Sequence, residues 1–114
     1  MNTFYSHLNI IPYNLIKSGK KIIESRINDE KRQLMQVGDT LFFILMGNDN
    51  EIIKTKIVNL HKFASFKELF AHFDKTLLGY AENEVADSKD MEQYYSKEEQ
   101  EKYGVVGIEI EIIK

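Results

Sequence analysis

The stretch SGKKIIESR, residues 18–26, lies where a predicted helix passes into a predicted strand. Gly19 is expected to end the helix, because glycine enters the left-handed backbone region without strain. The strand that follows, Lys21 to Ile27, carries more charge than strands usually do. Side chains two positions apart on a strand share a face, so Glu24 and Arg26 are predicted to point together. With the preceding lysine they would build a small polar pocket suited to recognition or catalysis.

Composition narrows the class of protein. The chain has 114 residues, of which 43% are hydrophobic and 29% charged, so one globular domain over residues 1–114 is expected. No run approaches the ~18 apolar residues of a membrane span, and no signal peptide is predicted at the N-terminus. Cysteine is absent, which excludes disulfides and thiolate chemistry and agrees with a cytoplasmic location.

Charge is unevenly distributed along the chain. Residues 1–35 hold six basic and three acidic residues (net +3), whereas residues 36–114 hold nine basic and fifteen acidic residues (net −6). An acidic chain is unsuited to wrapping long nucleic acid, but a local basic patch can hold one nucleotide or a short single strand. The three histidines are scattered, so neither a metal nor a cofactor is expected.

The order of predicted elements is strand, helix, three strands, helices and a final strand. Strands are expected at residues 4–11, 21–27, 40–46, 51–63 and 105–113, and helices after Pro12, at 66–73, at 90–95 and at 97–102. The polar segment 28–32 is expected to be a loop, Gly47–Asn50 a hairpin turn, and the slip in phase near Ile57 a bulge. Alternation along the last strand predicts one core face and one solvated face.

These elements predict an α+β fold: a small, curved, mostly antiparallel sheet or barrel of about five to six strands with two to four short helices. The motif Gly19-x-Lys21-x-x-Glu24-x-Arg26 resembles the signature of ASCH domains, a branch of the PUA-like β-barrel superfamily. Further features match in the same order along nearly the whole chain: Val37-Gly38-Asp39, Ser65-Phe66-Lys67-Glu68-Leu69, Tyr94-Tyr95-Ser96 and Tyr103-Gly104-Val105-Val106-Gly107-Ile108.

This resemblance implies a cleft beside the first helix, lined by Lys21, Glu24 and Arg26, that binds RNA or a small nucleoside or nucleotide. One bacterial branch of the family is an amidohydrolase of N4-acetylcytidine that uses a lysine, a threonine and a glutamate. Lys21 matches the lysine, but Glu24 occupies the threonine position, and a carboxylate is a poor substitute for a hydroxyl nucleophile. Glu82 is the nearest candidate for the second glutamate.

Roles for these residues follow from their chemistry. Lys21 and Arg26 would contact phosphate, a base carbonyl or a carboxylate. For Glu24 we favour binding or orientation over proton transfer, because neighbouring cations lower the pKa of a carboxyl group. Tyr94 and Tyr95 are candidates for stacking on a base, although aromatic residues near a helix end often complete a core.

Several alternatives remain open at this stage. Tyr103 is a further stacking candidate, and Ser25 and Thr40 are the only hydroxyl groups near the motif that could act as nucleophiles. RNA cleavage needs only acid–base groups and a cation. The acidic segment from Glu82 to Glu101 could instead serve a protein partner.

Overall fold

The computed structural model describes all of residues 1–114. Five strands and six short helices make up the chain. In order they are β1 (Thr3–Leu8), α1 (Ile10–Lys17), β2 (Ile23–Ile27), α2 (Glu30–Gln33), β3 (Thr40–Leu45), β4 (Asn48–Phe63), α3 (Phe66–His72), the 3₁₀ helices η1 (Lys75–Leu78) and η2 (Ser88–Gln93), α4 (Lys97–Tyr103) and β5 (Val105–Ile112).

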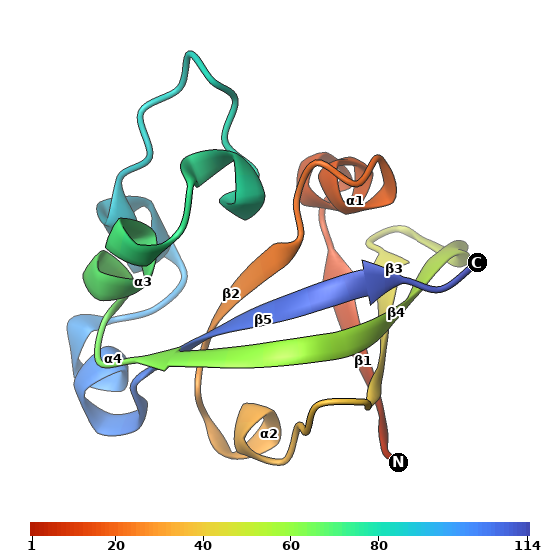
Figure 1. Ribbon diagram of the computed structural model, residues 1–114, viewed down its shortest axis with the longest axis horizontal. Coiled ribbons are helices and arrows are strands. Elements are labelled where there is room, and N and C mark those ends of the chain that lie inside the picture. The colour runs from red at the N-terminus through yellow and green to blue at the C-terminus, as the bar shows by residue number, and fades with distance from the viewer.

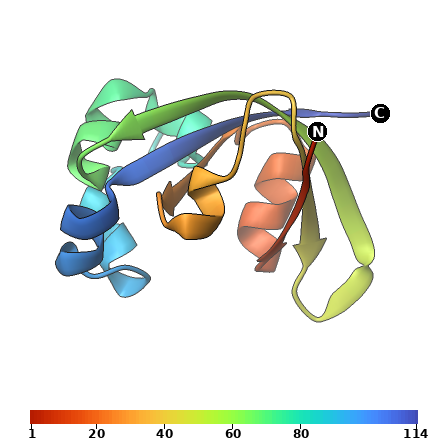
Figure 2. The same cartoon turned by 90° about the horizontal axis from the view of Figure 1, so that it is seen from below.

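The strands form one curved sheet in the order β1-β3-β4-β5-β2. Only β1 and β3 are parallel, and the other three pairs are antiparallel. The sheet is a half-barrel, because β1 and β2 are its two edges and do not pair with each other. Figure 2 shows α1 and α2 on the concave side of the arch made by β4 and β5. The predicted α+β fold with a mostly antiparallel, barrel-like sheet is therefore confirmed.

The long strand β4 joins the two sides of the half-barrel. It pairs with β3 near its start and with β5 from Thr55 to Phe63, and its register shifts between Ile57 and Asn59. A bulge bends a strand and strengthens its twist, which lets β4 follow the curve. The bulge predicted near Ile57 is thus present. The hairpin before β4 is tighter than predicted, because Leu45 already pairs with Asn48.

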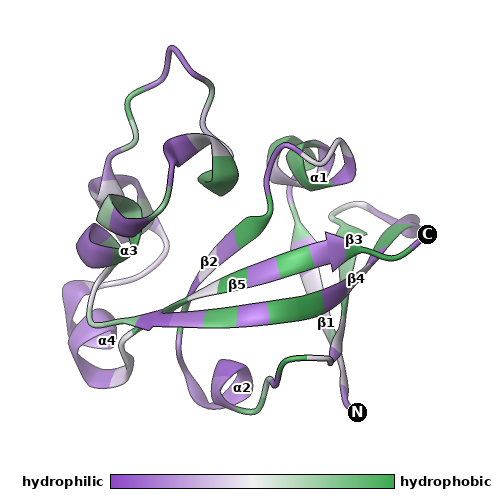
Figure 3. Cartoon of the chain, viewed as in Figure 1, coloured by the Kyte–Doolittle hydropathy of each residue, from purple (hydrophilic) through white to green (hydrophobic).

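Two groups of buried apolar side chains stabilise the fold. The first fills the half-barrel between α1 and the sheet, and it includes Tyr13, Ile16, Phe43 and Ile57. The second lies on the other side of β2 and β5, where α3, η2 and α4 gather at one end of the β4–β5 ribbon and η1 lies beside β2 (Figure 1). Apolar and polar bands alternate along the part of β4 and β5 away from those helices (Figure 3).

The expectation of one solvated face along the last strand is wrong for its first half. Residues 105–108 are all buried, because the first apolar group covers one face of β5 and the helices cover the other. Gly107 permits this close approach: a Cβ atom there would lie 3.1 Å from Ile23 and 3.3 Å from Phe73. A strand has one core face and one solvated face only where no other element packs on its second face.

Local hydrogen bonds explain the other corrections. The predicted loop 28–32 contains α2, because the Asp29 side chain accepts a hydrogen bond from the backbone N–H of Arg32 and caps a short helix. The first strand ends at Leu8 rather than residue 11, since the carbonyl of Asn9 already accepts a helical hydrogen bond from the backbone N–H of Tyr13. The second strand begins two residues later than predicted, because the N–H groups of residues 20 and 21 donate to the carbonyl of Leu15.

Candidate functional site

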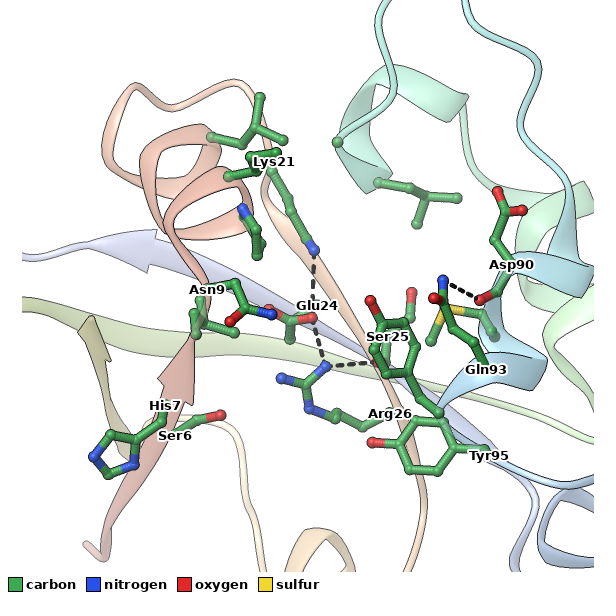
Figure 4. A pocket seen from close by; sticks show the side chains of 18 of the residues that line it. Ser6, His7, Asn9, Lys21, Glu24, Ser25, Arg26, Asp90, Gln93 and Tyr95 are labelled. Carbon is green, nitrogen blue, oxygen red and sulfur yellow. Dashed lines mark hydrogen bonds and ion pairs between the residues drawn. The ribbon is translucent and has the colours of Figure 1, made fainter. Parts of the chain in front are cut away.

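A cleft of about 670 Å³ opens between the two unpaired edges of the half-barrel. Its walls come from β1, β2, α1, α2 and the segment 78–95. Figure 4 shows it from close by. The polar and charged lining residues include Ser6, His7, Asn9, Lys21, Glu24, Ser25, Arg26, Lys31, Arg32, Glu84, Asp90 and Gln93, and the aromatic ones are Tyr5, Phe70, Tyr80, Tyr94 and Tyr95.

The three motif residues meet in this cleft. Glu24 Oε1 lies 2.8 Å from Arg26 Nη1 and 3.3 Å from Lys21 Nζ, so one carboxylate oxygen accepts from both cations. Figure 4 shows the lysine and the arginine approaching the carboxylate from opposite sides. The side chains of Lys21, Glu24 and Arg26 are only 13%, 4% and 17% exposed, which makes this a largely desolvated ion triad.

The electrostatics of the triad favour the charged forms of Glu24 and Arg26. Burial raises the pKa of Glu24, but Arg26, Lys21 and Arg32 together outweigh burial and hold that pKa below its usual range. For Arg26 burial lowers the pKa, but Glu24, together with Tyr95 and Tyr94, outweighs burial, so the net shift of that pKa is upward. Glu24 is therefore an anion at neutral pH. Its second oxygen, Oε2, is buried and accepts no hydrogen bond from the protein.

The turn around Gly79 holds the lysine of the triad in place. Gly79 has a φ angle of 102°, and a Cβ atom there would lie only 3.1 Å from the Lys21 side chain and 3.3 Å from that of Leu15. Next to Lys21, the backbone N–H of Ile22 donates to the carbonyl of Leu77 in η1. The lysine stem is thus packed between α1 and the η1 turn, which limits the positions of its ammonium group.

The aromatic candidates separate into two groups. Tyr94 and Tyr95 both line the cleft, and Tyr95 stacks on the buried Phe66 with ring centroids 5.7 Å apart, so it serves the core as well. Tyr103 does not line the cleft; its hydroxyl donates to Glu30. Tyr80 is a lining residue that the sequence did not single out, and its hydroxyl donates to Asp90 at 2.9 Å.

The remaining sequence candidates lie in different places. Glu82 is exposed and does not line the cleft, whereas Glu84, two residues further on, does. Ser25 lines the cleft and is buried. Thr40 lies on β3, opposite Thr3, and is not among the lining residues.

Sequence reasoning missed the contributions of β1 and α2. Lys31 Nζ donates to the backbone carbonyl of Tyr5 at 2.8 Å and so bridges α2 to the edge strand β1. Arg32 pairs with Asp29 at 3.1 Å, and its Nε is buried without a partner. The only available signal was the basic excess of residues 1–35, which does not specify which cations face the cleft.

No group of three or more histidine, cysteine, aspartate or glutamate side chains is arranged to hold a metal ion. None of the helices combines the length and apolar character that crossing a membrane requires.

Comparison with known proteins identifies the family. The ASCH domain model matches residues 12–114. Among solved structures, the crystal structure of hypothetical protein PH0355 superposes with a TM-score of 0.79 at 33% identity and covers 97% of this chain and 99% of its own. The solution NMR structure of protein PF0455 from Pyrococcus furiosus superposes with a TM-score of 0.75 at 27% identity, covering 98% of each chain. No curated protein matches the sequence. By its family model and by its fold, the chain belongs to the ASCH domain family.

Proposed function

We propose that this protein binds RNA or a single nucleoside or nucleotide, and that the base lies in the cleft against Lys21, Glu24 and Arg26. The observation that carries the proposal is the ion triad at the floor of the cleft. Three charges held in a largely dry site are an expensive arrangement for stability alone, since apolar side chains of similar size often serve a core as well. Membership of a family thought to bind RNA adds to this argument.

The chemistry of the triad suits the edge of a base. Lys21 and Arg26 each use one N–H group on Glu24 and keep further N–H groups for carbonyl, ring-nitrogen or phosphate acceptors. Glu24 Oε2 accepts nothing from the protein but is itself buried, so it would take an amino group only after a small movement of the Glu24 side chain. Cytosine presents an exocyclic amino donor beside ring and carbonyl acceptors, so a cytidine-like base would satisfy both kinds of group.

Tyr94 and Tyr95 form an aromatic wall of the cleft, on which the face of a bound base would stack. Tyr94 is exposed on one side of the cleft, next to the half-buried Tyr95. Stacking on an aromatic ring stabilises a bound base by about 1–3 kcal/mol and tolerates any base. Glu84 and Asp90 make the same wall acidic, which would keep a phosphate away from it and turn the sugar–phosphate side toward Lys31 and Arg32.

The amidohydrolase alternative acts on N4-acetylcytidine-like substrates through the same residues. Ser25, a buried hydroxyl in the cleft wall, is the observation that favours it. Against it, the carboxylate of Glu24 is occupied by two cations and its pKa is lowered, so it is a weak proton acceptor. Glu82 lies outside the cleft, and a hydrolase would have to use Glu84 or water in its place.

Calorimetric titration with cytidine, N4-acetylcytidine, other nucleosides and their monophosphates tests the proposal. Arg26→Ala is expected to weaken binding at least tenfold, and Lys17→Ala, an exposed residue outside the cleft, is the matched control. No binding by any nucleoside, nucleotide or short RNA up to millimolar concentration would refute it. Chromatography of the N4-acetylcytidine sample, with Lys21→Ala alongside, decides whether the ligand is also hydrolysed.

A further inference from the structure

We propose that the outer face of β1, β3 and β4 continues the cleft as a stacking surface, and that a single-stranded RNA segment next to the bound base lies on it. This inference rests on the proposed function, since it concerns the nucleotides that flank the one in the cleft. A stacking surface of this kind would distinguish a protein that binds oligonucleotides from one that binds free nucleosides. The cleft alone does not distinguish the two.

A stacked aromatic pair on the outer face, with one ring exposed and the other half-buried, is the first observation. Tyr5 of β1 is 56% exposed and stacks on Phe42 of β3, with ring centroids 5.4 Å apart and ring planes within 13° of parallel. Neither ring belongs to either of the two buried apolar groups. Two flat rings on a strand surface, Tyr5 exposed and Phe42 half-buried, form the kind of platform on which unstacked bases lie.

Strand register places a cation beside the pair. Phe42 pairs with Tyr5 on one side and with Lys54 of β4 on the other, so the three side chains form one row across the sheet. Lys54 is exposed and forms no ion pair. In the neighbouring row Lys56 lies opposite Thr40 on β3 and Glu111 on β5, so an acidic residue is in register with Lys56, whereas none is in register with Lys54.

The outer face is continuous with the cleft, and this continuity favours RNA as the molecule that binds there. Tyr5 belongs to both surfaces, because β1 is the edge strand that borders the cleft and its aromatic side chain lies on the outer row. Lys31 reaches the carbonyl of Tyr5 from the cleft side and places a positive charge where a backbone would cross that edge. Aromatic rings and lysines in alternation fit a phosphate-linked chain of bases better than they fit an apolar protein partner.

The test compares cytidine with a single-stranded oligocytidine of five nucleotides. The oligonucleotide is expected to bind about tenfold or more tightly than the nucleoside, because one further stacked base contributes on that scale. Phe42→Ala is expected to remove this advantage and leave the affinity for cytidine unchanged, since Phe42 does not line the cleft. Lys54→Glu is expected to weaken oligonucleotide binding and flatten its salt dependence.

Lys62→Glu is the matched control, because it reverses an exposed lysine of the same strand beyond the bulge. Thermal unfolding of each variant shows whether it is folded. Cytidine bound with no gain for the oligonucleotide, or a gain that survives Phe42→Ala and Lys54→Glu, would overturn the inference and leave the proposed function intact. If the unmodified protein binds neither cytidine nor the oligonucleotide, the proposed function itself is refuted. A dimer in solution that Phe42→Ala dissolves would assign this face to a second copy of the chain instead.

Discussion

Glu24→Gln is the sharpest perturbation of the ion triad. The variant keeps the size of the side chain and one carbonyl acceptor but removes the negative charge that lies 2.8 Å from Arg26 and 3.3 Å from Lys21. Two cations would then remain in a largely buried site without the anion that stabilises them. We expect the folded protein to become less stable, and the side chains of Lys21 and Arg26 to be held less firmly in position.

The magnitude follows from the burial of the three groups. Breaking a fully buried ion pair by removing one partner destabilises a protein by about 3–5 kcal/mol. The 13% and 17% exposure of Lys21 and Arg26 lets water reach part of each cation, and glutamine still accepts a hydrogen bond. We therefore expect a loss of about 2–3 kcal/mol, after discounting that range for hydration. For a domain of this size the loss corresponds to a fall in Tm of about 10 °C.

Chemical denaturation and thermal melts measure this change, with Glu51→Gln as the control. Glu51 also pairs with a lysine, but its oxygen lies 3.9 Å from Lys17 Nζ and the two side chains are 49% and 61% exposed. Neutralising such a surface pair changes stability by less than about 1 kcal/mol. Equal stability of Glu24→Gln and the unmodified protein, or equal losses in the two variants, would refute the view that the triad depends on a buried carboxylate charge.

Three further predictions follow from other contacts. Because folding lowers the pKa of Glu24, its contribution to stability is complete above the ordinary value of about 4.3 and disappears as pH falls through the lower folded-state pKa. Denaturation at several pH values should show a constant difference in stability between the unmodified protein and Glu24→Gln from pH 8 to about 5, and a decreasing difference below that. A difference that increases in acid would contradict the assignment. Ser96→Ala removes the hydroxyl that caps α4 and should lower stability by about 1 kcal/mol without changing ligand affinity, whereas Ser88→Ala, at a position that caps nothing, should leave both unchanged. Gly79→Val places a branched side chain at a φ of 102° and against Lys21, so calorimetry should find ligand binding weakened at least tenfold in a protein that still folds; undiminished affinity would mean that the turn does not position the lysine.

The fold was predictable where local chemistry and long-range packing agree. Ser96 and Glu99 form a capping box at the start of α4, where a helix is expected over residues 97–102, and the bulge occurs at the slip in alternation near Ile57. The parallel pairing of β1 with β3 was not predicted, because those strands are 31 residues apart at their closest and nothing local specifies the partner of an edge strand. The two-sided burial of β5 was missed for the same reason: the second covering layer comes from residues 66–103.

The site was likewise predictable where its contacts are local in sequence and not where they are long-range. Glu24 and Arg26 are two apart on one strand, so their contact could be inferred from spacing, and Lys21 reaches them from the adjoining turn. By contrast, Lys31 and Tyr5 meet across 26 positions of sequence. Glu82 and Glu84 show the limit of order-based placement, since a shift of two residues along an irregular segment decides which carboxylate lines the cleft.

The unpaired strand edges have a consequence for self-association. A free edge is a template on which another chain can add a strand, and proteins commonly protect such edges with lysine or with covering segments. Here β1 and β2 turn their free edges toward the same cleft within one molecule, and the Lys31 side chain occupies the carbonyl of Tyr5 on one of them. The cleft in which we propose that a ligand binds is therefore also the feature that hides both edges from neighbouring molecules. Replacing Lys31 with a residue too short to reach that carbonyl should expose β1 and promote aggregation at high protein concentration, an effect that light scattering would detect.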